Sequence, residues 1–448
     1  MLNRKRDLVL MKRKASILTF TATLLVLLLI VAPAPSLKAA YEAPQVQWEK
    51  AYGPYEGYSL VQTVDGGYAI AGQQAAFREF QRHLTSGWDN KTALLIKVDV
   101  SGNVEWTKAY DNEVGGGWRA DSVVQTMDSG YTIIGLQQHR TTTKNIVLLI
   151  KTDSDGKIQW NTTIAWSGST MECEGTLTRD GGYLIAGTSE SEYPNQFGWL
   201  VKTDETGNAL WNRTFGDSHT SARTVAEADD GGYVVAGSWE NDCWFAKTDV
   251  NGNLQWNQTY DFRFSDEIWT EYRLLSIAQA VDGGYLLAGS NGHRGFLVKT
   301  NSEGVMEWNR PYEDDSAFVS IVQATNGYGY FAVGGFSYPS DAGSWFVRLD
   351  SSGNILWNST NAIHDGKTSS INVARSVVKT SDGGYAVTGA LNSTIWLVKF
   401  APEPNTLPDD TSPPPDYVSP QFPTAWIVAV VIIVVGIGLL VYFKKRKN

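Results

Sequence analysis

The sequence predicts an all-β protein folded as a seven-bladed β-propeller, and three observations support this prediction. A Tyr–x–x–x–Gly element recurs seven times, at intervals of about 50 residues. Each repeat divides into four short segments rich in strand-forming residues, separated by Gly, Asn and Asp. Aromatic residues make up 12% of the chain and charged residues only 19%, which is unlike a helical protein. The repeated pairs are Tyr68/Gly72, Tyr131/Gly135, Tyr183/Gly187, Tyr233/Gly237, Tyr285/Gly289, Tyr330/Gly334 and Tyr385/Gly389.

Each repeat is expected to form one four-stranded antiparallel blade. In the first repeat, the expected strands are residues 59–64, 68–71, 94–98 and 104–110. The turns between them, DGG and SGN, contain residues that tolerate the positive φ of tight hairpins. Because one such sheet cannot bury both of its faces, the blades must pack against one another.

The end of the repeat array predicts how the ring closes. A Trp marks the fourth strand of six repeats, whereas the seventh repeat stops after its third strand, at Phe400. The missing strand stands at the start of the array, where VQWEKAY (46–52) closely matches VEWTKAY (104–110). We therefore expect the N-terminal strand 46–52 to complete the last blade, which removes a pair of exposed sheet edges.

The segments outside the propeller, residues 41–400, carry membrane-targeting features. Residues 1–40 have a basic start, an apolar run and small residues at their end, which predicts a signal peptide or, alternatively, an uncleaved signal anchor. The proline-rich segment 401–423 predicts an extended stalk. Residues 424–443 predict a single C-terminal transmembrane helix, and the basic tail 444–448 is expected to stay in the cytoplasm. The propeller is then extracellular, on a single-pass membrane protein.

Charge and motifs exclude several classes of function. Residues 41–423 contain 26 Lys and Arg against 46 Asp and Glu, a net charge of about −20, which argues against a nucleic-acid partner. The sequence has no G-x-S-x-G motif, no phosphate-binding glycine loop and no Cys/His pairing. Its five His fall in five different loops, so we expect no metal site.

The third-strand, turn and fourth-strand stretch, KTDETGNALW at 202–211, resembles the Trp-docking repeat of pyrroloquinoline-quinone-type propellers. It is also similar to the DGGY-rich propeller repeats of secreted and surface proteins of bacteria and archaea. The resemblance covers residues 46–400 and implies the fold. Quinoprotein dehydrogenases of that superfamily commonly have adjacent cysteines and a calcium–quinone site. This chain has no Cys-Cys pair and no stretch that matches the cofactor site, so no cofactor is expected.

The Asp–x–x–Gly–Asn turn of the repeat also resembles the Asp-box of sialidases, although each spacing is one residue longer. A calcium loop is the other functional interpretation. Calcium takes six or more oxygen ligands, whereas one short hairpin offers two or three. We therefore expect the Asp and Asn side chains to hydrogen-bond to the backbone of their own turn.

Strand order divides the connections between two faces. The first-to-second and third-to-fourth turns share one face, here called the turn face, and they are uniformly short. The second-to-third and blade-to-blade connections share the opposite loop face, and they vary widely, from 391–394 to 73–91 and 261–273. Binding residues usually lie on variable loops of a rigid scaffold, so the loop face is the expected functional face.

Two groups of side chains are candidate ligand contacts. The first is aromatic and suits sugar or protein contacts, with packing over the blade ends as the alternative: Trp118, Trp269 and Tyr272. The second lies at, or just before, first strands, which line the central channel, and could hold a carboxylate or sulfate there: Arg119, Arg223, Arg273 and Arg375. Salt bridges with rim carboxylates are the alternative role for these arginines.

Two kinds of covalent modification are left open by the sequence. Six Asn-x-Ser/Thr sequons predict N-glycosylation in a host that has the machinery: Asn90, Asn161, Asn212, Asn257, Asn358 and Asn392. The only cysteines, Cys173 and Cys243, fall in different repeats and predict either a disulfide or two buried thiols.

Taken together, these features predict a cell-surface-anchored, non-catalytic binding or scaffold propeller. It would contact a glycan, an envelope polymer or another surface protein through the loop face. The alternatives are an extracellular enzyme of the glycosidase or lyase type, because 46 acidic residues allow many carboxylate pairs, and a purely structural role in the envelope.

Overall fold

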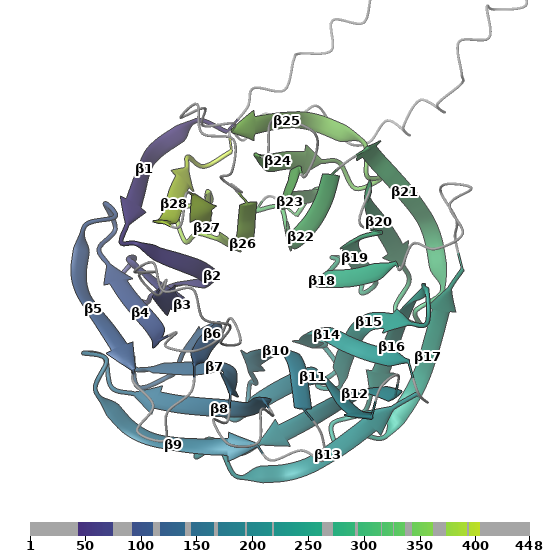
Figure 1. Cartoon of the computed structure of the whole chain (residues 1–448). Coiled ribbons are helices and arrows are strands. Elements are labelled where there is room, and N and C mark those ends of the chain that lie inside the picture. The colour runs from purple at the N-terminus through teal and green to yellow at the C-terminus, as the bar shows by residue number, and fades with distance from the viewer. Residues whose placement is uncertain are drawn as a thin grey trace, which may run out of the picture. The chain divides into compact units, whose positions relative to one another are not determined.

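The computed structural model contains seven four-stranded antiparallel sheets around a central axis in the part of the chain that it describes (Figure 1). Six sheets are made of four consecutive strands, and the seventh has the order β1–β28–β27–β26. The predicted all-β propeller of seven blades is therefore confirmed. The described residues are 44–74, 92–110, 117–138, 145–164, 169–192, 195–216, 219–261, 272–291, 294–314, 316–325, 327–336, 343–361, 373–391 and 394–403.

The blades are numbered 1 to 7 along the chain, and each has a first strand at the axis and a fourth strand at the rim. The first strands are β2 (Tyr55–Gln62), β6 (Trp118–Gln125), β10 (Ser169–Leu177), β14 (Thr220–Glu227), β18 (Arg273–Gln279), β22 (Ser316–Gln323) and β26 (Val373–Lys379). The second strands are β3 (Tyr68–Gln74), β7 (Tyr131–Gln138), β11 (Tyr183–Glu192), β15 (Tyr233–Trp239), β19 (Tyr285–Ser290), β23 (Tyr330–Phe336) and β27 (Tyr385–Leu391).

The outer half of each blade follows the same scheme. The third strands are β4 (Thr92–Val98), β8 (Asn145–Thr152), β12 (Asn195–Thr203), β16 (Asp242–Thr248), β20 (Arg294–Thr300), β24 (Ser344–Leu349) and β28 (Thr394–Phe400). The fourth strands are β5 (Val104–Tyr110), β9 (Ile158–Ile164), β13 (Ala209–Phe215), β17 (Leu254–Tyr260), β21 (Met306–Asp314), β25 (Ile355–Asn361) and, for blade 7, β1 (Val46–Tyr52).

The apolar core lies between the blades. Second and third strands such as β4 and β19 are buried along nearly their whole length, because both faces of these strands meet a neighbouring blade. Seven clusters of buried side chains fill the seven interfaces between adjacent blades. The cluster between blades 7 and 1 contains Ile395 and Leu397 from one blade and Tyr68 and Leu94 from the other. A core at every interface, including this last one, means that the ring is closed.

The N-terminal strand closes the ring, as the sequence predicts. β1 pairs antiparallel with β28, with Trp48 opposite Lys399 and Tyr52 opposite Ile395. The Ala401 N–H donates a hydrogen bond of 2.8 Å to the Gln45 carbonyl just beyond these strands. The described chain therefore enters and leaves the propeller at adjacent points. Both points lie on the turn face, because β28 ends where the other third-strand segments meet their hairpin turns.

Fourth strands also fasten each blade to the next. The Trp48 ring packs edge-on against Tyr68 of blade 1 at 5.8 Å, and the Tyr52 hydroxyl donates a hydrogen bond of 2.8 Å to the Gly102 carbonyl. Gly102 has a φ of +76°, and a Cβ there would lie 2.8 Å from the Trp48 ring. The Trp of one blade and the Gly of the next are therefore in direct contact, and this contact joins the two blades. The same ring pairing recurs as Trp106–Tyr131, Trp160–Tyr183, Trp211–Tyr233 and Trp256–Tyr285.

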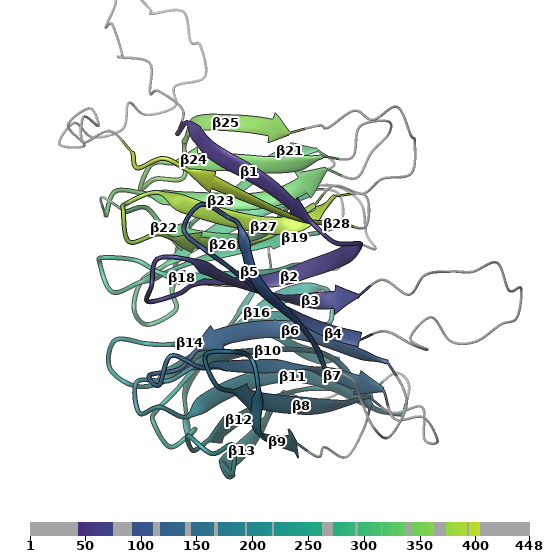
Figure 2. The same ribbon diagram turned by 90° about the vertical axis from the view of Figure 1, so that its left-hand side faces the viewer.

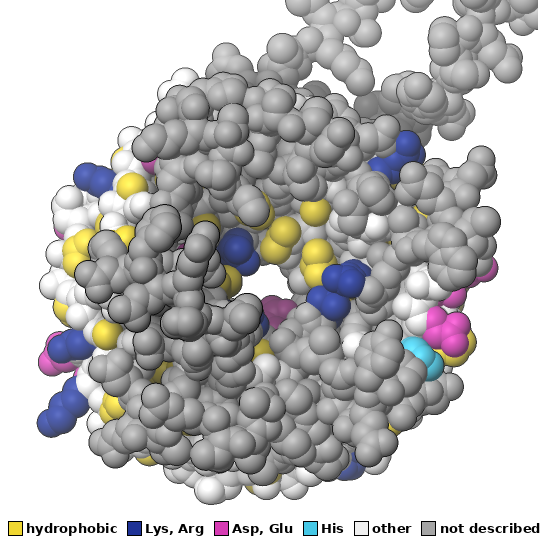
Figure 3. Space-filling model, in the orientation of Figure 1, with side chains coloured by type: hydrophobic (Ala, Val, Ile, Leu, Met, Phe, Trp, Pro, Cys, Tyr) yellow, Lys and Arg dark blue, Asp and Glu magenta, His cyan; other side chains and the backbone are white. Residues whose placement is uncertain are grey.

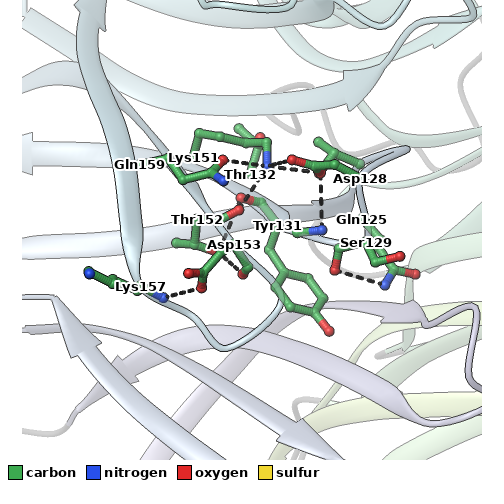
Figure 4. Close-up of polar contacts among 12 residues, drawn as sticks. Gln125, Asp128, Ser129, Tyr131, Thr132, Lys151, Thr152, Asp153, Lys157 and Gln159 are labelled. Carbon is green, nitrogen blue, oxygen red and sulfur yellow. Dashed lines mark hydrogen bonds and ion pairs between the residues drawn. The ribbon is translucent and has the colours of Figure 1, made fainter.

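A buried lysine on the third strand explains a second repeated residue. Lys151 is 6% exposed, and its ammonium group donates to the carboxylate of Asp128 at 2.8 Å, to the Gln159 side chain and to the Thr152 carbonyl (Figure 4). It thereby ties the first hairpin turn of the blade to the second. Equivalent ion pairs are Lys97–Asp65, Lys202–Asp180, Lys247–Asp230, Lys299–Asp282 and Lys399–Asp382.

Blade 6 departs from this pattern. Its turn has Asn326 where the other blades have Asp, and its third strand has Arg348 in place of Lys. Arg348 pairs at 2.7 Å with Glu403, which lies beyond β28, and Glu403 also accepts a hydrogen bond of 2.6 Å from the Tyr385 hydroxyl. Both charged side chains are almost fully buried, at 0% and 3% exposure. The segment that leaves the ring is thus fixed beneath blades 6 and 7.

The targeting segments predicted from the sequence are not described by the structure. The predicted signal segment 1–40, most of the predicted stalk, from residue 404 on, and the predicted membrane span 424–443 lie outside the described residues. Within the described part of the chain, no helix has the length and apolar character needed to cross a bilayer.

The ion pairs make stability depend on pH in a defined window. Burial alone would raise the pKa of Asp128, but hydrogen bonds from Lys151, Thr126 and Gly130 outweigh it and lower this pKa to about 2. An aspartate with a pKa below its unfolded value of about 4 stabilises the fold above pH 4, and this contribution is lost as the pH falls to about 2.

We expect Asp128→Asn to be less stable than the wild type at neutral pH, with the difference shrinking between about pH 4 and pH 2. Denaturant unfolding across this range measures it, and Asp155→Asn in the neighbouring exposed turn is the control. A difference that does not change with pH would show that the carboxylate charge is not what stabilises this turn.

Candidate functional site

A repeated β-bulge positions the side chains that face the central channel. In six blades the first strand has one extra residue at the same place, which bends the strand and re-aims a side chain. In blade 3 the irregularity lies at Met171 instead. The six extra residues are Tyr58, Asp121, Arg223, Leu275, Val319 and Arg375.

The glycine of the Tyr–x–x–x–Gly element exists because of this bulge. A Cβ on Gly72 would lie 2.0 Å from the Glu56 carbonyl oxygen, and one on Gly135 would lie 1.9 Å from that of Arg119. Both oxygens belong to the bulged first strand, so no other residue fits without moving the backbone. The same close approach occurs at Gly237, Gly289, Gly334 and Gly389.

The structure brings two of the four predicted arginines together. The Arg375 guanidinium of blade 7 lies over the ring of Tyr58 at 4.7 Å, and the Arg119 guanidinium of blade 2 lies at 5.7 Å from the same ring. Tyr58 belongs to blade 1, between them. Arg223 occupies the bulge position of blade 4, and Arg273 starts the first strand of blade 5. The cluster is therefore centred on an aromatic ring that the sequence analysis did not single out.

Tyr58 is held by two further polar side chains. Its hydroxyl donates a hydrogen bond of 2.6 Å to the Glu56 carboxylate, and the amide of Gln73 donates to both Glu56 at 2.6 Å and the Tyr58 hydroxyl at 2.7 Å. Burial, followed by the hydrogen bond to Glu56, raises the pKa of Tyr58 above its usual range. The phenol is therefore neutral and acts as a fixed donor.

Asp121 completes the group on the side of blade 2. Its carboxylate accepts a hydrogen bond of 2.5 Å from Arg119 and one of 3.7 Å from the Cys173 thiol. Burial raises the pKa of Asp121, although the charges of Arg119 and Arg375 act in the opposite direction. We call Glu56, Tyr58, Gln73, Arg119, Asp121 and Arg375 the channel cluster.

The channel cluster lies in the half of the channel nearer the loop face, because first strands begin at that face and the cluster uses their early residues. The space-filling view onto this face is hollowed at its centre, where basic and hydrophobic side chains surround an opening (Figure 3). Leu275 and Val319 supply apolar side chains at the bulge positions of blades 5 and 6.

A hydroxyl after the bulge links neighbouring first strands around the channel. Ser59 accepts a hydrogen bond of 3.1 Å from the Val123 N–H of the next blade, and Ser122 accepts one of 3.1 Å from Gly175. Blade 3 has Glu174 in the place of this serine. Burial raises the pKa of Glu174 to about 8, despite a hydrogen bond with Thr224. A carboxyl in this position is therefore largely protonated at neutral pH.

Two of the candidate aromatic contacts are buried, which agrees with the alternative that they pack at the blade ends. Trp118 is 1% exposed: it begins β6 and packs against Tyr110 at 6.2 Å in the core between blades 1 and 2. Tyr272 is 5% exposed and packs against Phe296 in the core between blades 4 and 5. Trp118 is the first residue of a first strand and Tyr272 immediately precedes one, and both fill the interface between blades. Trp269 lies outside the described residues.

The modification sites have mixed outcomes. Asn161, Asn212, Asn257 and Asn358 are all exposed on fourth strands, so their side chains are accessible at the rim. Asn90 and Asn392 lie outside the described residues. Cys173 and Cys243 form no disulfide, and both are buried thiols in different blades. Burial raises the pKa of Cys243 well above its usual value.

The Asp–x–x–Gly–Asn turns bind their own backbone, as predicted. The Asp99 carboxylate accepts hydrogen bonds from the N–H groups of Ser101 and Asn103 at 2.9 and 2.8 Å. These oxygens are therefore already used within the turn. Among the described residues, no three His, Cys, Asp or Glu side chains are grouped as they would be to hold a metal ion.

A signal for the channel cluster was present in the sequence. Between a small or apolar residue and a Ser or Thr, the first strand has a position that changes from blade to blade, as in GYS (57–59), ADS (120–122) and ARS (374–376). A position that varies inside an otherwise repeated strand indicates a side chain that does not pack between the blades, as its neighbours do. Comparing the repeats position by position would have identified Tyr58 and Asp121.

Comparisons with known proteins identify no family. No family model matches the chain, and no curated protein is significantly similar to it. The chain is similar to Sqt1 of Chaetomium thermophilum solved with the N-terminus of ribosomal protein L10, at 11% identity and a TM-score of 0.47, over 79% of this chain and 99% of that one. It is similar to the Pan2 WD40 domain of Neurospora crassa at 9% identity and a TM-score of 0.47, over 81% and 96%. It is similar to the Dos1 propeller at 11% and 0.44, over 77% and 96%.

The bulge geometry predicts that two Gly→Ala substitutions in blade 1 lower stability by different amounts. We expect Gly72→Ala to destabilise the protein by about 1–3 kcal/mol, because the new Cβ overlaps a backbone oxygen that cannot move alone. Gly57→Ala, on the opposite strand, should cost less, because its Cβ would meet its nearest neighbours at 3.1–3.4 Å. Denaturant unfolding of both variants tests this order, and equal effects would contradict the role of the bulge.

The raised pKa of Glu174 predicts that stability changes with pH in the direction opposite to that expected for Asp128. An acid with a raised folded pKa binds protons more tightly in the folded state, so stability falls as the pH rises from about 4 through about 8. We expect Glu174→Gln to remove this fall, gaining stability relative to wild type at pH 8 and not at pH 5. Glu205→Gln, an exposed change in the same blade, is the control. Parallel wild-type and Glu174→Gln profiles would refute the assignment.

Proposed function

We propose that this protein is a cell-surface-anchored binding or scaffold propeller without catalytic activity, which contacts its partner through the loop face. The partner would be a glycan, an envelope polymer or another surface protein. The N-terminal segment 1–40 would direct export, and residues 424–443 would hold the protein in the membrane. These segments are proposed from their sequence patterns.

The observation that carries this proposal is the contrast in connection length between the two faces. On the turn face, every connection within a blade has five residues except residues 324–329 of blade 6, which number six. On the loop face, the connections range from residue 315 alone to the seventeen residues 75–91. Because the blades between them are nearly identical, folding does not require this variation. Variation confined to one face of a rigid scaffold is typical of a binding surface.

The position of the chain ends supports the same orientation. The propeller begins at Gln45 and ends at Ala401 on the turn face, and the Arg348–Glu403 ion pair fixes the segment that follows. A membrane anchor attached there would leave the loop face directed away from the bilayer. The exposed sequons on the rim would not obstruct that face.

We expect that replacing residues 75–91 with the Glu240–Asn241 connection of blade 4 will abolish or weaken partner binding while the propeller stays folded. Shortening a surface connection changes stability little, because loop-closure entropy varies slowly with length. The full chain in detergent is screened against glycan arrays and envelope fractions, and the wild type and the loop variant are compared on whatever binds.

The control is Asp155→Lys on the turn face, which should leave binding unchanged. Loss of binding in the control, or full binding in this loop variant and in one with residues 362–372 shortened in the same way, would contradict the loop face as the contact surface. Release of cleaved products from the bound glycan would favour the alternative of a glycosidase or lyase.

A further inference from the structure

The Arg375 side chain in the channel has a hydrogen-bonding group that the described residues do not satisfy. Its Nε is buried and has no hydrogen-bond partner among them. The guanidinium is nevertheless held in place, because the bulge of β26 aims it into the channel and the ring of Tyr58 lies 4.7 Å beneath it. A buried charged donor without an acceptor is costly, and a bound acceptor would remove this cost.

The neighbouring carboxylates do not supply this acceptor. Asp121 receives the hydrogen bond of Arg119 at 2.5 Å, and Glu56 receives those of Tyr58 and Gln73 at 2.6 Å each. The Gln73 carbonyl oxygen is also buried without a partner among the described residues. The two acids therefore accept hydrogen bonds from other members of the channel cluster. Neither of them accepts one from the Nε of Arg375.

We propose that Arg375 binds the carboxylate of a small organic monoanion inside the central channel, at the end near the loop face. A guanidinium and a carboxylate are both planar and can form two parallel charge-assisted hydrogen bonds. The Gln73 oxygen offers an acceptor to a hydroxyl of the same ligand. An acidic sugar, which has one carboxylate and several hydroxyls, combines these two features.

Within the channel cluster, charge favours a ligand with a single negative group. Arg119 and Arg375 face Asp121 and Glu56, so two positive groups are balanced by two acids when both acids are ionised. A dianion such as sulfate would meet repulsion from these carboxylates, whereas a monoanion adds one charge beside Arg375, whose Nε has no hydrogen-bond partner among the described residues. Across the channel, blades 4 and 5 have Arg223 and Leu275 at the same bulge positions, and Val319 has this position in blade 6, next to blade 7. Leu275 and Val319 offer apolar contacts to an uncharged ligand body.

The channel that contains the proposed site is open at its axis on the loop face. The view onto the loop face shows an opening at the axis with basic and hydrophobic side chains at its edge (Figure 3). First strands begin at this face, so the early residues of β2 and β6 lie near the opening. The inference goes beyond the proposed function and does not rest on it, because it concerns the channel wall and none of the variable connections.

The test is isothermal titration calorimetry of the full chain in detergent with glucuronate, acetate, sulfate and uncharged glucose. We expect one site for glucuronate, weaker binding of acetate, and no binding of glucose. Arg375→Gln should weaken glucuronate binding about tenfold to a hundredfold, which is the loss expected of one charge-assisted pair. Arg375→Lys, which keeps the charge and loses the planar fork, should fall between this variant and the wild type.

Arg213→Gln is the matched control, because Arg213 lies on the rim in β13 and donates to the Gly252 and Asn251 carbonyls. This control should bind glucuronate as the wild type does. The proposal is overturned if neither carboxylate binds, if Arg375→Gln binds as well as the folded wild type, or if sulfate binds more tightly than glucuronate. Far-UV circular dichroism and unfolding curves establish that each variant is folded.

Discussion

The pairing of β1 with β28 is the contact on which the rest of the structure depends. It gives blade 7 its fourth strand, and it brings Trp48 and Tyr52 against blade 1. Without it, the apolar cluster between blades 7 and 1 would face water on one side, and two sheet edges would be exposed. Every other interface is formed between segments that follow each other in the chain. This one joins residues about 350 positions apart, so it has the largest loop-closure entropy cost of any single interface.

The first strand of each blade has two roles. It packs against neighbouring strands in the same way in every blade, and it also supplies channel side chains that differ from blade to blade. The packing demand is met by the second-strand glycines, which let the first-strand backbone approach within about 2 Å of a Cβ position. The bulge that results frees one side chain per blade from the packing between blades. Tyr58, Asp121 and Arg375 use this freedom to form a polar group on one side of the channel, whereas the same position holds Arg223 in blade 4 and the apolar residues Leu275 and Val319 in blades 5 and 6. The bulge position is thus one place in an otherwise repeated strand where side-chain chemistry differs from blade to blade.

The fold was predictable from the sequence because its determinants are local and repeated. The four strands of a blade, the turn residues and the missing seventh Trp strand all appear as short patterns, and the structure has them within a few residues of the expected bounds. The site was only partly predictable. Arg119 and Arg375 were identified from their place in first strands, but their shared contact with Tyr58 depends on which blades are adjacent and on a bulge that changes the direction of side chains.

Burial near strand ends was the other feature that the sequence did not reveal. Trp118 and Tyr272 stand where a variable connection meets a first strand, and nothing in the local pattern distinguishes an exposed aromatic from one that fills the end of an interface. Their burial follows from Tyr110 and Phe296, which belong to the preceding blade and to a later strand of the same blade. Such contacts are set by tertiary structure.

The hydrogen bond between Ala401 and Gln45 has a consequence for the architecture as a whole. Since the first and last residues of the ring touch, a short peptide could join them, and the chain could be reopened at another loop-face connection without altering any blade. Such a circular permutant would contain the same sheets in the same order around the axis. The present starting point is therefore one of several equivalent places at which this ring could be cut. It differs from the others in leaving both chain ends on the turn face, beside the Arg348–Glu403 ion pair.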